Sequence, residues 1–466
     1  MARKSVFCAA LMALFFFSFV FAQNDSGKGL IKLPEGLEVR PHAYGHLEVG
    51  QIGQGTYDPS RYDRNGYNYK IDHVWTEDAF ALVGFEALYR EHFKMVFELG
   101  TKLYFSYPVL FDQRYTKNLR QDVGLGDVYA QYHFGEAATP WLLAQVGYFN
   151  FKYNPDVRNL GEYMFRSGTY PAFLDMSFDF PSARLLGLHA QSNLFKSLKL
   201  DVLFTSATIF PAMNWSLAAL ANYDVAGLHF INIGAGVDFA HLLSVYTDHS
   251  FPSLGGDLTT PKATNVNNQY IINGDTAFYT FQGTKIMGRI SIDPKAFIKS
   301  KYLGENDLKL YAEACIIGAK NYPDSGILMG GSYTLVAPSY NNLIEKTPIA
   351  IGFNFPTFKL LDVLNMEIEY FGSKYLNDAA QFINLGSQPQ PSLIIFQNTT
   401  TGLVESKYKW SVYAKKSFFD GHFAVAGQVG RDHMRLPCAS YNDEMWNELL
   451  VEDKDWWWVL KTSWMF

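Results

Sequence analysis

The sequence predicts an all-β fold, a transmembrane antiparallel up-and-down β-barrel of about 16 strands. Three observations lead to this prediction. Apolar and polar side chains alternate at every second position through much of the chain, as in strands with two different faces. The gaps between these segments are alternately short and long. After the N-terminus, no apolar run reaches the roughly 20 residues that a membrane helix needs, so a crossing would have to use strands.

The N-terminus has the order of a secretory signal peptide. Arg3 and Lys4 precede the apolar stretch VFCAALMALFFFSFVFA, which ends on the small residue Ala22. A basic start, an apolar run and a small-residue cleavage site predict export, with residues 1–22 removed. Residues 23–36 are then a short periplasmic segment, and residues 37–466 form the barrel.

Charge and cysteine content exclude several classes of protein. Removal of the signal leaves 37 Lys and Arg (39 less Arg3 and Lys4) against 45 Asp and Glu, a formal charge of −8. Such a chain is not expected to bind nucleic acid. Only Cys315 and Cys438 remain, too few for a disulfide framework, and no cysteine–histidine spacing suggests a zinc site. We therefore expect no metal and no cofactor.

The segment FKMVFELGTKLYF shows the alternation most clearly. Phe97 and Leu99 fall on one face of an extended strand, whereas Lys94 and Glu98 fall on the other. A soluble antiparallel sheet also has this pattern, so the barrel prediction depends on the repetition of the pattern along the chain. Sixteen segments are predicted as strands: 41–52, 78–90, 93–106, 123–134, 141–151, 183–195, 199–208, 214–224, 228–240, 277–293, 307–318, 347–356, 362–372, 407–417, 422–432 and 455–466.

The order of the gaps separates a barrel from a soluble sandwich. Short gaps such as GEAATP and FFDGH alternate with long polar stretches at 53–77, 107–122, 152–182, 241–276, 319–346, 373–406 and 433–454, with one short exception at 209–213. A soluble β-sandwich does not require short and long loops to alternate along the chain. The pattern predicts short periplasmic turns and long extracellular loops. Within one of the turns, DPKAFI is predicted to form a helical turn.

The chain ends on WWWVLKTSWMF, in which Phe466, Trp464 and Leu460 share one face of the last predicted strand. With the signal peptide, the even strand number and the sorted loops, this ending resembles the Gram-negative outer-membrane β-barrels of the porin class. In that class a terminal aromatic residue, usually Phe, is read by the barrel assembly machinery. The resemblance implies an assembly signal at Phe466 and Trp464, a place among outer-membrane lipids and small solutes as cargo. It leaves a monomer and a homotrimer both open.

The face opposite the lipid would line the lumen of such a barrel. Charges of both signs fall on it in similar numbers, which favours a solvated wall over a strongly ion-selective one. The candidate lumen-wall residues are Lys94, Glu98, Lys102, Asp127, Lys285, Arg289, Glu367 and Glu369.

The stretch 152–182 is longer than a loop without a role usually is. Its segment NLGEYMFRSG is predicted as a short helix. In classical porins the loop after the fifth strand folds into the lumen, and 152–182 follows the fifth predicted strand. The resemblance therefore makes four residues candidates for a constriction, with an ordinary solvated loop as the alternative. They are Asp156, Arg158, Glu162 and Arg166.

The sequence thus predicts a channel for passive diffusion of small hydrophilic solutes, and not an enzyme. The inward histidines His133 and His189 have no distinctive spacing to a serine, and no GxSxG elbow occurs, so no catalytic residue is assigned. Two alternatives stay open. One is a selective transporter for hydrophobic compounds or oligosaccharides, which the 16% aromatic content favours. The other is a structural or adhesive barrel whose long loops, such as 257–276, bind surfaces.

Overall fold

The computed structural model describes residues 35–57, 69–70, 72–105, 120–136, 139–166, 174–175, 182–195, 197–206, 215–225, 228, 230–243, 269–272, 275–278, 283–298, 300–320, 342–372, 407–432, 450 and 452–466. The predicted signal peptide at 1–22 and nearly all of the predicted segment 23–36 lie outside these residues. Within the described ranges, no helix is long and apolar enough to cross a membrane.

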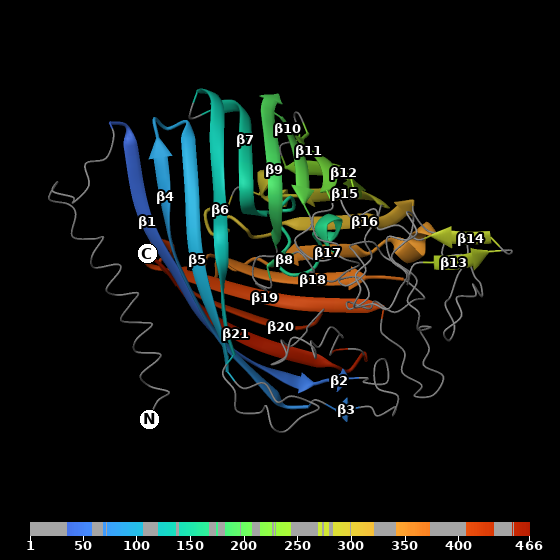
Figure 1. Cartoon of the computed structure of the whole chain (residues 1–466). Coiled ribbons are helices and arrows are strands. Elements are labelled where there is room, and N and C mark those ends of the chain that lie inside the picture. The colour runs from blue at the N-terminus through green and yellow to red at the C-terminus, as the bar shows by residue number, and fades with distance from the viewer. Residues whose placement is uncertain are drawn as a thin grey trace.

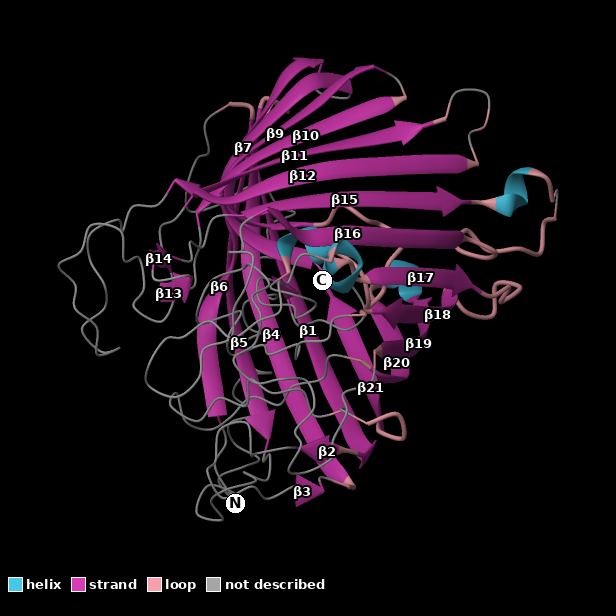
Figure 2. Ribbon diagram, turned by 90° about the vertical axis from the view of Figure 1, so that its right-hand side faces the viewer, coloured by secondary structure: helices cyan, strands magenta, loops and turns pink. Residues whose placement is uncertain are grey.

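Apart from two short hairpins, the described strands form one closed antiparallel barrel (Figures 1 and 2), in which neighbours in sequence are neighbours in the sheet. Its sixteen wall strands are β1 (Leu37–Gln54), β4 (Val74–Tyr89), β5 (Phe93–Phe105), β6 (Arg120–Glu136), β7 (Thr139–Phe151), β9 (Ser182–Phe195), β10 (Leu198–Ser206), β11 (Trp215–Asp224), β12 (Ile231–Leu243), β15 (Gly283–Ile292), β16 (Leu310–Lys320), β17 (Ile349–Asn354), β18 (Val363–Tyr370), β19 (Tyr408–Phe418), β20 (Phe423–Arg431) and β21 (Trp456–Met465).

Smaller elements lie on the barrel wall or beside it. The two-residue strand β8 (Leu174–Asp175) pairs with β9, and two hairpins stand apart from the barrel, β2 (Thr56–Tyr57) with β3 (Tyr69–Lys70) and β13 (Gln269–Ile272) with β14 (Asp275–Phe278). The 3-10 turns are η4 (Tyr163–Phe165), η7 (Pro294–Ala296), η8 (Leu343–Lys346) and η9 (Phe419–Gly421). The helical turn predicted for DPKAFI is η7, where the Asp293 side chain accepts from the Lys295 amide.

All sixteen predicted segments overlap a wall strand, but several strand ends differ from the predicted bounds. The strands range from 18 residues in β1 to 6 in β17. β4 starts at Val74, inside the predicted loop 53–77, because β1 extends far enough to pair Ile52 with Val74. Strand length is therefore decided by the neighbouring strand, which the pattern of one segment does not reveal.

The barrel closes between its first and last strands. Backbone pairing of β1 with β21 runs from Tyr44 opposite Met465 to Gln54 opposite Trp456. Beyond it, the amide of Phe466 donates to the Ala43 carbonyl and the amide of Ala43 donates to the Phe466 carbonyl, both at 2.9 Å. Within this seam, the Trp464 ring lies over its pairing partner Gly45, where a Cβ atom would come within 2.5 Å of it. Glycine at this position therefore makes room for the terminal tryptophan.

The outer surface of the barrel is an apolar band. Exposed aliphatic and phenylalanine side chains occur around the whole circumference, including Leu47, Phe97, Leu99, Leu125, Val146, Leu188, Val202, Ile233, Ile286, Ile351, Ile368 and Leu460. Exposed aromatic residues gather at both strand ends, with Trp75, Tyr408 and Trp456 at the long-loop end and Tyr89, Trp141, Tyr223, Phe418 and Phe466 at the short-turn end. An apolar belt between two aromatic girdles is the surface that a membrane β-barrel presents to lipid.

A charge on this belt should destabilise the barrel far more than the same charge inside. Leu188 points outward from β9 and is 51% exposed, whereas Gln191 on the same strand points inward. We expect Leu188→Arg to lower the free energy of unfolding in lipid vesicles by about 2–4 kcal/mol. Gln191→Arg is the matched control and should change it little. Urea titrations that rank the two variants in the opposite order would show that the faces are reversed.

Candidate functional site

A segment of the chain enters the barrel directly after β7. Residues 152–166, which we call the lumen loop, leave the wall at Phe151 and reach strands β16, β18 and β20 on the far side. The described part of the predicted stretch 152–182 thus lies inside the barrel. Its predicted helix is reduced to the single turn η4, because side chains of the opposite wall bind the loop's amides.

Glu367 on β18 is the strongest of these anchors. Its two carboxylate oxygens accept the backbone amides of Arg158 at 2.6 Å, Asn159 at 2.8 Å and Leu160 at 2.8 Å. The Tyr311 hydroxyl donates to the same carboxylate at 2.5 Å. Glu367 is only 1% exposed. One buried carboxylate therefore satisfies three consecutive loop amides that would otherwise be costly to bury.

Two further carboxylates fix the rest of the loop. Glu313 on β16 accepts from the Tyr153 hydroxyl at 2.6 Å, the Asn154 side-chain amide at 2.7 Å and the Tyr163 backbone amide at 3.0 Å. Glu369 on β18 accepts from the Tyr163 hydroxyl at 2.6 Å. Such charge-assisted hydrogen bonds have a fixed geometry, so the loop is held in one place.

Apolar packing covers the underside of the lumen loop. Its side chains Leu160, Tyr163, Met164 and Phe165 form one buried cluster with inward residues of seven strands. Those wall residues are Phe149, Phe151, Ala183, Leu185, Leu203, Ala218, Leu220, Met287, Cys315, Ile317 and Ala350. The loop is therefore seated on a small hydrophobic core inside the barrel, and not suspended in water.

The loop tip is also tied to the last two strands. Asp432 accepts from the indole nitrogen of Trp457 at 2.7 Å and from the Gln428 side chain at 2.8 Å. The Asn159 side chain donates to the same carboxylate. One of the three consecutive tryptophans near the chain end thus points inward and helps to hold the residue that binds the loop.

The four predicted constriction residues all lie in the lumen loop, but in different surroundings. Glu162 is fully buried and accepts the amides of Tyr153 and Asn154, so it braces the loop instead of facing an opening. Burial, followed by the charge of Glu313, raises the pKa of Glu162 to about 8. Arg166 is also buried, donating to the Asn159 carbonyl and lying over the Tyr163 ring.

The other two candidates lie nearer to open space. Asp156 pairs with Lys309 at 3.6 Å and lines the chamber described below. Arg158 is half-buried, and its backbone, not its guanidinium, makes the bond to Glu367. Asp156 and Arg158 are therefore the members of the predicted set that could face a passing solute.

The eight candidate lumen-wall residues divide into two groups. On β5 and β6 the side chains keep exposed surface and pair across strands: Lys94 with Glu86, Glu98 with His42, Lys102 with Asp78, and Asp127 with Asn150. On β15 and β18 they are covered by the lumen loop, as for Lys285, whose ammonium donates to the Arg166 carbonyl at 2.6 Å. The expectation of a solvated wall is wrong for Lys285, Glu367 and Glu369, because the loop lies on top of them, whereas Arg289, 6% exposed, lines the chamber described below.

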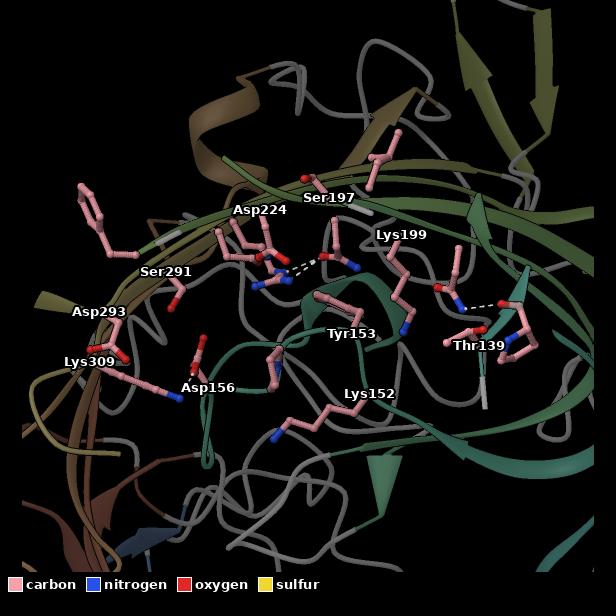
Figure 3. A pocket seen from close by; sticks show the side chains of 18 residues that line it. Thr139, Lys152, Tyr153, Asp156, Ser197, Lys199, Asp224, Ser291, Asp293 and Lys309 are labelled. Atoms are coloured by element: carbon pink, nitrogen blue, oxygen red, sulfur yellow. Dashed lines mark hydrogen bonds and ion pairs between the residues drawn. The ribbon is translucent and has the colours of Figure 1, made fainter. Parts of the chain in front are cut away.

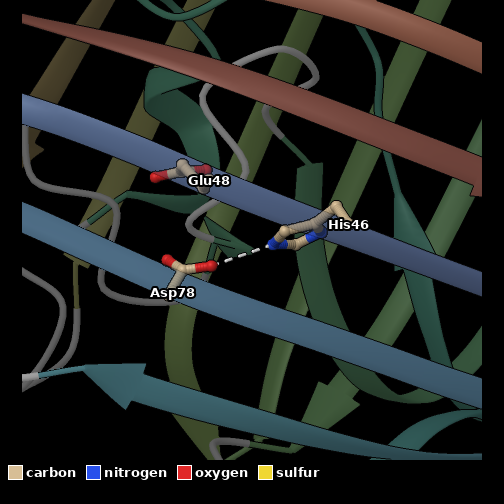
Figure 4. A group of neighbouring side chains, drawn as sticks. All are labelled: His46, Glu48 and Asp78. Carbon is tan, nitrogen blue, oxygen red and sulfur yellow. Dashed lines mark hydrogen bonds and ion pairs between the residues drawn. The ribbon is translucent and has the colours of Figure 1, made fainter. Parts of the chain in front are cut away.

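His46, Glu48 and Asp78 form a compact cluster on β1 and β4 (Figure 4). Each offers one ligand atom, and the three atoms lie within 4.8 Å of one another. Asp78 is already engaged, however, by the His46 ring at 3.1 Å and by the Lys102 ammonium at 3.3 Å. A neighbouring ammonium opposes a bound cation, so we interpret the cluster as a charge-compensated hydrogen-bond network.

A chamber of about 990 Å³ opens between the lumen loop and the short-turn ends of the strands (Figure 3). The loop contributes Lys152, Tyr153 and Asp156 to its lining. The wall contributes Thr139, Pro140, Asn193, Ser197, Leu198, Lys199, Asn222, Asp224, Phe230, Asn232, Arg289, Ser291, Asp293 and Lys309. A concave site of this size, lined by convergent polar groups, is the usual form of a small-molecule site.

In chain path, the protein is similar to outer-membrane porins. It resembles OprB of Pseudomonas putida with a TM-score of 0.46 and 11% identity, over 92% of this chain and 94% of that one. It resembles the channel DcaP of Acinetobacter baumannii with a TM-score of 0.40 and 10% identity, over 94% and 99%. For a mutant of the Rh. blastica porin, the values are 0.36 and 8%, over 92% and 100%. No family model and no curated protein sequence matches the chain. The barrel assignment rests on the strand pairing of this chain itself.

Sequence reasoning missed the residues that bind the lumen loop. Four residues were not assigned: Tyr153 and Asn154 of the loop, which donate to Glu313, and on the wall Asp432, which accepts from Asn159, and Tyr311, which donates to Glu367. A signal was present in the segment ACIIGA, where Cys315 and Ile317 are apolar on the inward face as well. Strands that are apolar on both faces indicate that something covers the lumen side.

Proposed function

We propose that the protein is an outer-membrane channel for the passive diffusion of small hydrophilic solutes. One observation carries the proposal: a charged interior, enclosed by an apolar belt with two aromatic girdles, is partly filled by a loop fixed to the wall by Glu313, Glu367 and Glu369. A barrel of this strand number encloses an aqueous space unless something fills it. The lumen loop covers one side of the wall and leaves charged side chains of β5 and β6 exposed on the other.

The setting follows from the same features. The apolar belt would lie in outer-membrane lipid, with short turns in the periplasm and long loops outside. Insertion would depend on the barrel assembly machinery, which we infer reads Phe466 and Trp464 at the closing seam. The outer surface fits either a monomer or a homotrimer. An adhesive role would depend on the long loops, which fall largely outside the described residues.

Solute-dependent swelling of proteoliposomes tests the channel function. Vesicles containing the purified barrel should swell in isosmotic glycerol, more slowly in larger neutral polyols, and not at all in a large branched polysaccharide. A narrowed aqueous path predicts this steep dependence on solute size. Vesicles that hold inserted, heat-modifiable protein and yet do not swell in glycerol would refute diffusion and favour a structural barrel. Swelling that saturates for one solute only would favour a selective transporter.

A further inference from the structure

We propose that the chamber beneath the lumen loop is a binding site for small organic oxyanions, carboxylates or phosphate esters, with Arg289 as its central donor. The proposal deepens the channel function and rests on it, because it names the class of solute that the interior would retain. Figure 3 shows the chamber, with side chains of the loop on one side and of strands β7 to β15 on the other.

The Arg289 side chain is fixed in one orientation, as the side chains of binding sites usually are. It lies on β15, 6% exposed, and its Nε atom donates to the Asn222 side-chain oxygen at 3.1 Å. One terminal nitrogen donates to the same oxygen. Gly234 on β12 lies between the two residues, and a Cβ atom there would come within 2.6 Å of Nε and 2.9 Å of the Asn222 oxygen. Asn222 and Gly234 thus hold the guanidinium against the wall in one orientation.

The guanidinium still has donors to offer. Among the described residues, no carboxylate lies within ion-pair distance of Arg289, and the only hydrogen-bond acceptor that it contacts is the Asn222 oxygen. Five N–H groups in a planar fork match the two oxygens of a carboxylate or phosphate. A nearly buried cation is costly to leave unpaired. An oxyanion in the chamber would pair with the guanidinium and accept hydrogen bonds from its unused donors.

The acidic side chains of the chamber do not act as the oxyanion partner of Arg289, because each already has another partner. Asp156 pairs with Lys309 at 3.6 Å, and Asp293 pairs with Lys295 at 3.3 Å. Asp224 accepts from the Asn232 side chain at 2.7 Å. Glu313, opposite Arg289 in the sheet, is bound by the lumen loop. Local pairing therefore leaves the guanidinium of Arg289 to face a solute.

The remaining lining fits the neutral part of a small polar molecule. Thr139, Asn193, Ser197 and Ser291 offer hydroxyl and amide groups, and Phe230 adds one apolar side chain. A volume of about 990 Å³ holds such a solute together with bridging water. The expected ligand is thus a small organic molecule with one charged oxyanion group and a hydroxylated or amide-bearing body.

Uptake of paired solutes into proteoliposomes tests the proposal. The pairs are lactate with neutral lactamide, and glycerol 3-phosphate with neutral glycerol. In the wild type, anion uptake should saturate, whereas uptake of the neutral partners should rise linearly. Arg289→Gln should raise the half-saturation concentration about tenfold, which corresponds to about 1.4 kcal/mol. Lys301→Gln removes one charge from the exposed turn beyond the chamber and should leave uptake unchanged.

The outcomes separate this inference from the channel function. If the neutral solutes also fail to enter, the channel itself is refuted. If they enter but anion uptake is linear, or is equal in the wild type and Arg289→Gln, the anion site alone is refuted. A carboxylate site and a phosphate site are distinguished by which anion saturates. If Arg289→Gln does not fold, competition decides in the wild type, where a millimolar competitor of the same class as the anion that saturates, acetate for lactate or inorganic phosphate for glycerol 3-phosphate, should inhibit its uptake; an absence of inhibition would overturn the proposal.

Discussion

Deletion of Phe466 should prevent the barrel from closing and inserting. The residue supplies both the donor and the acceptor of a reciprocal backbone pair with Ala43, just beyond the last pairing of β1 with β21. The deletion removes that pair, places a terminal carboxylate on Met465 and removes an exposed aromatic ring from the short-turn girdle. We expect the truncated chain to accumulate in the periplasm and be degraded. The amount of membrane-inserted protein should fall at least roughly tenfold, because the two closing backbone hydrogen bonds are lost.

The amount of heat-modifiable protein in the outer-membrane fraction measures this effect. Phe419→Ala is the matched control, because Phe419 is an aromatic residue at the same end, 77% exposed, in the turn η9 and away from the β1–β21 seam. It should insert normally. Phe466→Leu keeps the backbone pair and should give an intermediate level. Normal insertion of the deletion variant would show that closure does not need its last residue.

Removal of the lumen loop should widen the channel without opening the barrel. The loop covers inward faces from β7 to β18, about half of the wall, so we expect replacement of residues 155–165 by a short Gly-Ser turn to roughly double the conductance. The barrel should survive, because none of its strand pairings involves these residues. Glu313, Glu367 and Glu369 would then face water as charged side chains, which should shift the ion preference toward cations.

The alternating pattern was sufficient to predict the strands and their faces. Glu367 and Glu369 were placed inward and Ile368 outward, and the structure confirms this alternation. Period-2 patterning is a local property, since each side chain reports its own face. Strand ends were predicted less well, as at Val74 on β4, because pairing with β1 sets them.

The contacts of the lumen loop could not be predicted in the same way. The amide of Leu160 and the carboxylate of Glu367 are 207 positions apart, and no local pattern relates them. The loop itself was predicted only from its length and its place after the fifth strand. Which of its charges would be buried, as Glu162 is, depends on packing against seven strands at once.

Single-channel current across planar lipid bilayers measures whether the barrel conducts and whether the lumen loop narrows it. Wild-type protein and the variant shortened at 155–165 would be reconstituted side by side, together with a variant shortened to the same extent within the predicted outer loop 319–346. We expect a stable conductance for the wild type, a conductance about twice as large for the variant without the lumen loop, and no change for the outer-loop control. Inserted wild-type barrels that carry no current, or a shortened lumen loop that leaves the conductance unchanged, would contradict these expectations.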